Sequence, residues 1–185
     1  MRKILKFTKW LIIGIFSLVI LSVLYLRFSR FSDAMIYQTS GFDYEVFESD
    51  LNYEQLFFEV DKTIKIHGVL FKPDSLPVIG TIFHYSGKGM HLNSSMQNSY
   101  KPLLEKGFQI FCFERRGFGK SNGEATNSLT LKKDALFVFD DVSKLDDVAN
   151  KPIIIWGQSL GGSFAVMNAV ERQKNINGLI LEDTF

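Results

Sequence analysis

The sequence predicts an α/β fold, in which a mostly parallel β-sheet carries helices on both faces and follows one transmembrane helix. Three observations predict it. Uncharged, strongly apolar residues fill the stretch from Trp10 to Leu26. From residue 78 onward, short apolar runs alternate with stretches whose apolar residues recur with the 3.6-residue period of a helix. A serine flanked by glycines stands at one junction between such a run and a helix.

The run from Trp10 to Leu26 is just long enough to cross a bilayer. As a helix it would extend roughly 25 Å, against a hydrocarbon core of about 30 Å. Four cations precede the run and two follow it, so the positive-inside rule favours a cytoplasmic N-terminus and a main domain on the non-cytoplasmic side. A cleaved signal peptide is the alternative, but residues 25–29 lack the small-x-small pattern of a cleavage site. We therefore expect residues 1–30 to form a retained single-pass anchor.

The next part of the chain changes from a linker to β-structure. Residues 31–52 are polar and aromatic without a clear period, so we expect a linker there and a domain over 53–185. Residues 53–61 and 63–71 alternate apolar and polar side chains, which predicts an antiparallel hairpin. After a proline-rich turn, residues 78–84 form the nearly continuous apolar run that is typical of a central strand buried on both faces.

Strands and helices alternate through the rest of the chain. The pattern predicts helices over 95–106, 131–145 and 163–172, and strands over 108–113, 152–156 and 178–181. This order predicts a parallel sheet whose loops at the C-terminal strand ends form the site.

Composition excludes several classes of function. Basic and acidic residues number 21 and 20 and are spread along the chain, so no basic stripe indicates nucleic acid. The single cysteine, Cys112, lies in an apolar run and allows neither an intramolecular disulfide nor a thiolate zinc cluster. No nucleotide-binding fingerprint is present, and we expect no cofactor and no metal.

The segment Gly157-Gln158-Ser159-Leu160-Gly161-Gly162 joins a predicted strand to a predicted helix. This is the context of a nucleophile elbow, in which flanking glycines let the strand and helix approach closely around a strained serine. We predict that Ser159 is the nucleophile and that the N–H of Leu160, at the start of the helix, stabilises the oxyanion of acyl transfer. An ordinary glycine-rich helix cap is the alternative.

Three stretches together resemble the α/β-hydrolase superfamily, in particular its serine aminopeptidase-like and esterase branch, over about residues 56–185. Arg116-Gly117-Phe118-Gly119-Lys120-Ser121 resembles the R-G-[FY]-G-x-S loop after the fourth strand. The elbow matches G-x-S-x-G-G, and Leu179-Ile180-Leu181-Glu182 resembles the sixth strand.

The resemblance implies further site residues. The third strand ends in His84-Tyr85-Ser86-Gly87, where the family has H-G-x, so Ser86 would supply the second oxyanion amide. Tyr85 replaces the family's glycine and indicates a rebuilt or damaged oxyanion hole. Asp183, after the sixth strand, stands where a minority of members carry the catalytic acid; the commoner place is after a seventh strand. The resemblance implies more strands beyond residue 185, so we expect the fold to be incomplete at its C-terminus.

The catalytic histidine of the superfamily lies downstream of the nucleophile, yet all three histidines of this chain, His67, His84 and His91, precede Ser159. We expect His67 at the far edge of the sheet and His84 as a residue that fixes its loop. The leading hypothesis is a membrane-anchored serine hydrolase that acts on an acyl bond, with little or no turnover by this chain alone. The alternative is a noncatalytic, membrane-tethered binding or structural protein of the same fold.

Overall fold

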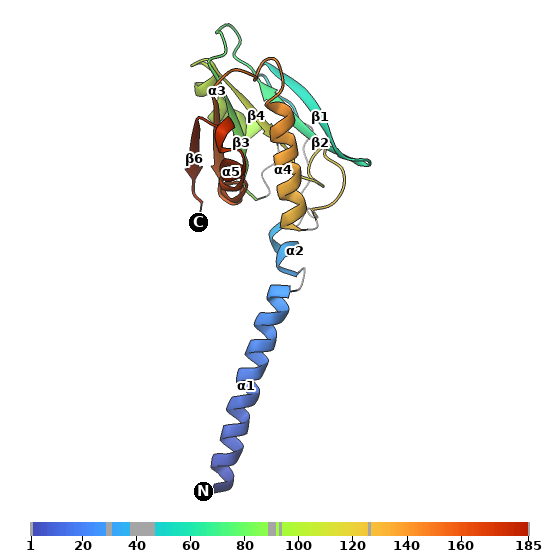
Figure 1. The fold of residues 1–185 in the computed structure, drawn as a ribbon, viewed down its shortest axis with the longest axis vertical. Coiled ribbons are helices and arrows are strands. Elements are labelled where there is room, and N and C mark those ends of the chain that lie inside the picture. Colours follow the sequence, from blue (N-terminus) through green and yellow to red (C-terminus); the bar gives the residue numbers. More distant parts are fainter. Residues whose placement is uncertain are drawn as a thin grey trace.

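The computed structural model describes residues 2–28, 31–37, 47–88, 92, 94–125 and 127–184. A long helix, α1 (Arg2–Phe28), projects away from the body of the molecule and is followed by the short helix α2 (Phe31–Tyr37) (Figure 1). The span Lys6–Arg27 within α1 is long and apolar enough to cross a membrane, and none of it is buried against the rest of the chain.

A six-stranded mixed sheet forms the body, in the spatial order β1-β2-β4-β3-β5-β6. Strands β3 to β6 pair in parallel, whereas β1 pairs with β2, and β2 with β4, in antiparallel fashion. The strands are β1 (Tyr53–Asp61), β2 (Ile64–Phe71), β3 (Gly80–Tyr85), β4 (Phe108–Phe113), β5 (Ile153–Gln158) and β6 (Gly178–Glu182). The predicted α/β fold with a mostly parallel sheet is confirmed.

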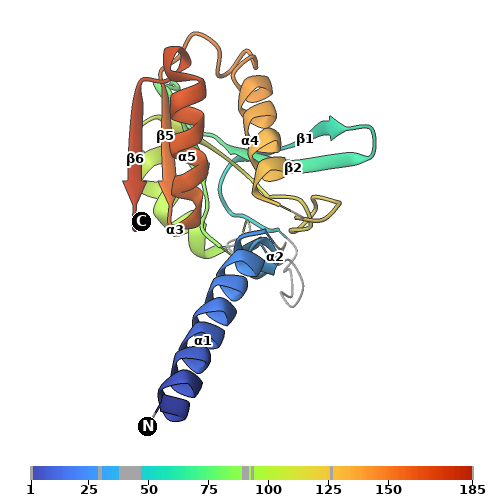
Figure 2. The same cartoon turned by 60° about the horizontal axis from the view of Figure 1, so that its bottom comes forward.

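Helices cover both faces of the sheet, as Figure 2 shows from a second side. Helices α4 (Ser128–Val142) and α5 (Leu160–Glu171) share one hydrophobic core with Leu70, Phe83 and Phe111 of the sheet. Helix α3 (Ser94–Leu104) packs on the other face, where Tyr100 and Leu104 contact a second core built around Val69, Ile82 and Ile110. Successive strand residues point to opposite faces, so one strand contributes to both cores.

The hairpin lies at the side of the sheet away from β5 and β6, as expected, but β1 is the edge strand and β2, which carries His67, lies one position inside it. The reason is burial. Strand β1 alternates exposed and covered residues, whereas β2 is buried on both faces over its last six residues and pairs with β4 through Gly68–Phe71. A strand of that kind is stable only between two neighbours.

Part of the predicted linker packs against the domain. Tyr37, at the end of α2, belongs to the α4–α5 core, and Phe47 is buried in the α3 core beside Tyr53 and Phe71. Residues 38–46 of the linker lie outside the described residues. The aromatic residues in this segment therefore connect α1 to the body through packing.

Candidate active site

The turn from β5 to α5 gives Ser159 an unusual backbone. Its φ of 49° and ψ of −121° lie outside the regions that non-glycine residues ordinarily occupy. Its N–H donates to the carbonyl of Glu182 on β6 at 2.9 Å, and its own carbonyl accepts from the N–H of Gly162 at 2.9 Å. The neighbouring strand and the first helical turn thus hold the serine in this conformation. The helix begins at Leu160, three residues earlier than the sequence predicted.

Glycines let three segments meet around Ser159. A β-carbon on Gly157 would lie 2.5 Å from the side chain of Ala165, so a larger residue would push β5 away from α5. A β-carbon on Gly161 would collide with the backbone carbonyls of Tyr85 and Ser86 at the end of β3. The end of β3 therefore lies directly against the start of α5, as a nucleophile elbow requires.

This contact brings the two predicted oxyanion donors to neighbouring positions. Leu160 is the first residue of α5, so its N–H has no acceptor within the helix and points from the positive end of the helix dipole. Ser86 follows β3 directly, beside Gly161. The start of α5 and the end of β3 are therefore adjacent.

Tyr85 does not fill the space in front of the serine. Its side chain is buried in the α4–α5 core, where its ring stacks on Phe164 and its hydroxyl contacts the amide of Asn168 at 2.5 Å. Burial raises the pKa of this hydroxyl above its ordinary range. The tyrosine that stands in place of the family's glycine is therefore a core residue.

Arg115 is a site residue that sequence reasoning missed. Its guanidinium donates to the carbonyl of Ser86 at 3.2 Å and to that of Gly87 at 2.9 Å, and it lies 6.0 Å from the ring centre of Phe164. The loop after β3 is thus held between this cation and the start of α5. No pattern in the sequence marks Arg115, which stands directly before the R-G-F-G-K-S stretch.

The other arginine, Arg116, fixes the R-G-F-G-K-S loop to α4. Its Nε and one terminal nitrogen donate to the two carboxylate oxygens of Asp134 at 2.5 and 2.8 Å. This paired geometry is the strong form of an arginine–carboxylate contact. It orders the loop from which Arg115 reaches the end of β3.

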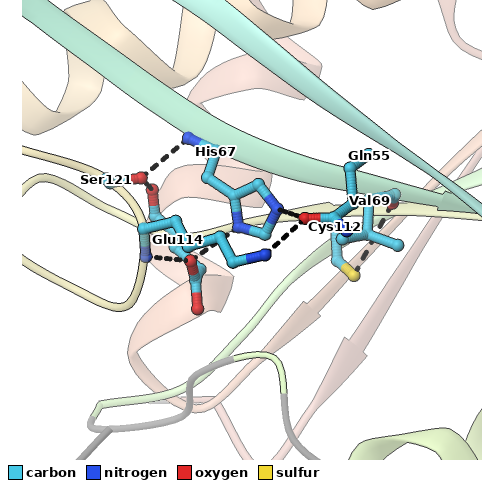
Figure 3. A network of polar contacts seen from close by, with 7 residues as sticks. Gln55, His67, Val69, Cys112, Glu114 and Ser121 are labelled. Atoms are coloured by element: carbon cyan, nitrogen blue, oxygen red, sulfur yellow. Dashed lines mark hydrogen bonds and ion pairs between the residues drawn. The ribbon is translucent and has the colours of Figure 1, made fainter. Parts of the chain in front are cut away.

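The ring of His67 is buried within a polar network beneath the same loop (Figure 3). Its Nδ1 lies 2.7 Å from a carboxylate oxygen of Glu114, and its Nε2 lies 3.1 Å from the side-chain oxygen of Gln55. The hydroxyl of Ser121 accepts a hydrogen bond from the backbone N–H of His67 at 2.8 Å and donates one to the backbone carbonyl of Glu114 at 2.7 Å. Both ring nitrogens are engaged, so this histidine is unsuited to be the base for Ser159.

His84 is equally unsuited to be the base. It is buried on the α3 face, stacked on Trp156 at a ring-centre distance of 4.1 Å, and its Nδ1 lies 2.7 Å from the hydroxyl of Tyr100. Burial lowers the pKa of the imidazole to about 4. Its described hydrogen bond reaches Tyr100 of α3 and not the loop after β3, so the role of fixing that loop stays a prediction.

Two predicted residues, His91 and Asp183, have no described contact with Ser159. His91 lies outside the described residues. Asp183 follows β6 with a φ of 49° and is exposed, next to the residue whose carbonyl holds the Ser159 N–H. Within the described ranges, no group of three or more His, Cys, Asp or Glu side chains could hold a metal ion. An apolar hollow of about 280 Å³ lies elsewhere, at the end of β2 and α3, and contains none of these residues.

The sheet order, the strained serine between β5 and α5, and the glycine contacts define an α/β-hydrolase. A family model described as serine aminopeptidase, S33, matches residues 77–184, which is more than half of the chain. The protein therefore belongs to this family of the α/β-hydrolase superfamily.

Individual relatives agree with this family. The protein YfhR of Escherichia coli O157:H7 is 33% identical over 113 residues, which cover 58% of this chain and 37% of the relative. Lysophosphatidylserine lipase ABHD12 of Xenopus tropicalis is 33% identical over 114 residues, which cover 60% of this chain and 28% of the lipase. The chain thus spans less than half the length of these relatives.

Solved structures share the fold. The Pyrococcus furiosus esterase Pf2001 superposes with a TM-score of 0.63 at 17% identity, over 80% of this chain and 57% of the esterase. At this identity the likeness concerns the fold alone.

Proposed function

We propose that Ser159 is the nucleophile of a serine hydrolase that cleaves an ester, amide or similar acyl bond. The observation that carries the proposal is the backbone of Ser159, held at φ 49° between β5 and α5 by the N–H bond to Glu182. A non-glycine residue in this region is costly, by roughly 1–3 kcal/mol, and such strain concentrates at functional sites. The side chain of Ser159 makes no capping hydrogen bond to α5, so its hydroxyl does not stabilise the start of that helix.

In the proposed reaction the Ser159 oxygen attacks the acyl carbon and passes its proton to a base. The carbonyl electrons move to the oxygen, and the N–H groups of Leu160 and Ser86 stabilise that oxyanion. The leaving group then departs with a proton, and water releases the acyl group from the serine. Asp183, at the end of β6, is our candidate for the acid that orients the base.

The described histidines do not supply the base that Ser159 needs. His67 and His84 are buried and bonded to other groups, so neither supports rapid turnover. Where no other group serves as the base, we expect slow reaction, because only binding and oxyanion stabilisation then remain. The name of the Xenopus relative, a lysophosphatidylserine lipase, favours a lipid ester among the possible substrates.

A fluorophosphonate probe tests this function. Labelling should be measured on this chain, on the longest open reading frame that contains it, and on Ser159→Ala versions of both. We expect weak labelling where no base is present, strong labelling where a longer frame supplies one, and no labelling of any alanine variant. Equal labelling of the alanine variants would overturn the assignment of Ser159.

We further propose that α1 is a single-pass anchor with the domain on the non-cytoplasmic side. The support is an apolar span with no buried part, and the excess of cations before it. Carbonate extraction of membranes should leave the chain in the pellet, and protease added to the non-cytoplasmic side should digest the domain. Release by carbonate would contradict the anchor.

The competing proposal is a noncatalytic, membrane-tethered protein of the same fold. It is favoured by the structural engagement of His67 and His84. A folded product that fails to label in both the short and the long form would establish this alternative and exclude the hydrolase.

A further inference from the structure

Helix α2 contacts the same segments that frame Ser159. The ring of Tyr37 meets that of Phe164 on α5 edge to face, with 6.5 Å between ring centres. It also belongs to the hydrophobic core that contains Leu131 and Ala135 of α4. Lys88, in the loop after β3, donates from Nζ to the carbonyl of Met35 at 2.6 Å. Three separate elements at the carboxyl edge of the sheet therefore hold α2.

The connection from α2 to α1 is short. Only two residues separate Phe28, the last residue of α1, from Phe31, the first of α2. Three Cα–Cα steps span at most about 11 Å. If α1 crosses a bilayer, α2 must lie close to the membrane surface.

The exposed surface of α2 suits that position. Met35 and Ile36 are 57% and 41% exposed, so α2 carries apolar side chains that the rest of the chain does not cover. Figures 1 and 2 both place α2 between α1 and the end of the body where β6 and the chain end. Apolar side chains beside a membrane helix are favourable at the lipid interface.

We infer that the carboxyl edge of the sheet is the membrane-facing surface of the protein, with α2 lying on the lipid headgroups and Tyr37 locking it against α4 and α5. The candidate site around Ser159 then opens toward the bilayer. This orientation rests on the proposed anchor and concerns a docking surface for lipid, which neither the nucleophile nor the fold by itself requires.

Energy transfer to the membrane surface tests the orientation. A donor dye is attached at Leu129→Cys, near the start of α4, or at Lys174→Cys, just after α5, in the full chain; both native residues are exposed. Arg172, two residues before Lys174, pairs with Asp140, which lies eleven residues after Leu129 along α4, so the two dyes should differ by roughly 16 Å in depth. The native Cys112 is buried, and the chain without an added cysteine is the labelling control.

The chain is reconstituted in phosphatidylcholine vesicles that carry rhodamine-labelled phosphatidylethanolamine. We expect several-fold higher transfer from residue 129 than from residue 174. The difference should persist in Tyr37→Phe, which keeps the ring contact with Phe164, and should fall in Tyr37→Ala. Lys88→Met provides a second variant that weakens the same attachment away from the core.

Each outcome decides the inference. Equal transfer from the two positions, or higher transfer from residue 174, would overturn the orientation. An undiminished difference in a folded Tyr37→Ala chain would overturn the role of Tyr37. These readouts do not depend on Ser159 chemistry, and carbonate extraction tests the anchor separately, so a failure here is distinct from a failure of the proposed function.

Discussion

The backbone carbonyl of Tyr85 occupies the space that a β-carbon on Gly161 would need. The end of β3 and the start of α5 therefore touch only because residue 161 has no side chain. This contact places Ser86 beside Leu160, and the geometry of the candidate site depends on it.

We predict that Gly161→Ala destabilises the protein by about 1–3 kcal/mol, the usual cost of overpacking, because β3 and α5 must separate. Denaturant unfolding in detergent, followed by fluorescence, measures this cost. Gly178→Ala is the matched control, since a β-carbon there would lie 3.7 Å from Ile154, an ordinary contact. Equal stability of the two variants would contradict the close approach at Gly161.

The Arg116–Asp134 pair should matter far more than a second pair of similar geometry. Its side chains are only 15% and 7% exposed, so Asp134→Ala leaves a partly buried guanidinium without its partner, at a cost of about 1–3 kcal/mol. Asp140→Ala breaks the paired contact with Arg172, whose side chains are 30% and 37% exposed, and should cost at most about 1 kcal/mol. Comparable losses in the two variants would refute the role of burial.

His84 should make stability depend on pH. Burial lowers the pKa of the folded imidazole to about 4, from an ordinary value of 6.5. Between about pH 6.5 and pH 4 this imidazole is protonated in the unfolded state but neutral in the folded state. The free energy of unfolding is therefore highest above pH 6.5 and falls by about 3 kcal/mol as the pH decreases to 4.

Unfolding midpoints of wild type and His84→Gln across this pH range measure the effect. Glutamine can still bond the Tyr100 hydroxyl but does not titrate, so its profile should lose this part of the slope. An unchanged slope would assign the acid sensitivity to other groups.

Glu114 should hold the R-G-F-G-K-S loop through its carboxylate. One oxygen lies 2.7 Å from Nδ1 of His67 and 2.8 Å from the N–H of Lys120. Glu114→Gln weakens this double acceptor and should cost about 1–3 kcal/mol. Glu59→Gln, in an exposed pair with Lys65, is the matched control and should leave the unfolding midpoint unchanged. A loss no greater than that of the control would show that the network is not stabilising.

The strands were the most predictable part of the fold. Strands β1 and β4 match their predicted ranges, and the other four differ by one or two residues at an end, because alternation and apolar runs are local signals. The elbow was also predictable, since Gly157 and Gly161 are needed for the close approach of β5, α5 and the end of β3 around Ser159. The start of α5 was placed too late because Gly161 and Gly162, poor helix formers, are kept in the helix by their contacts with β3 and Thr184.

What the sequence did not reveal depends on distant contacts. Arg115 carries no pattern that points to the carbonyls of Ser86 and Gly87, which lie almost thirty residues earlier. Tyr37 lies in a segment without periodicity, and its partner Phe164 follows the nucleophile. The inner place of β2 likewise depends on its pairing with β4, which alternation within the strand does not specify.

Mapping the modified residue tests the central claim most directly. The longest reading frame containing this chain should be treated with a fluorophosphonate, digested and analysed by mass spectrometry, with Ser163→Ala as a nearby serine control. Our account predicts a single adduct on Ser159, lost in Ser159→Ala and retained in Ser163→Ala, whose hydroxyl only bonds the Leu160 carbonyl. An adduct on another residue, or none on a folded protein, would contradict it.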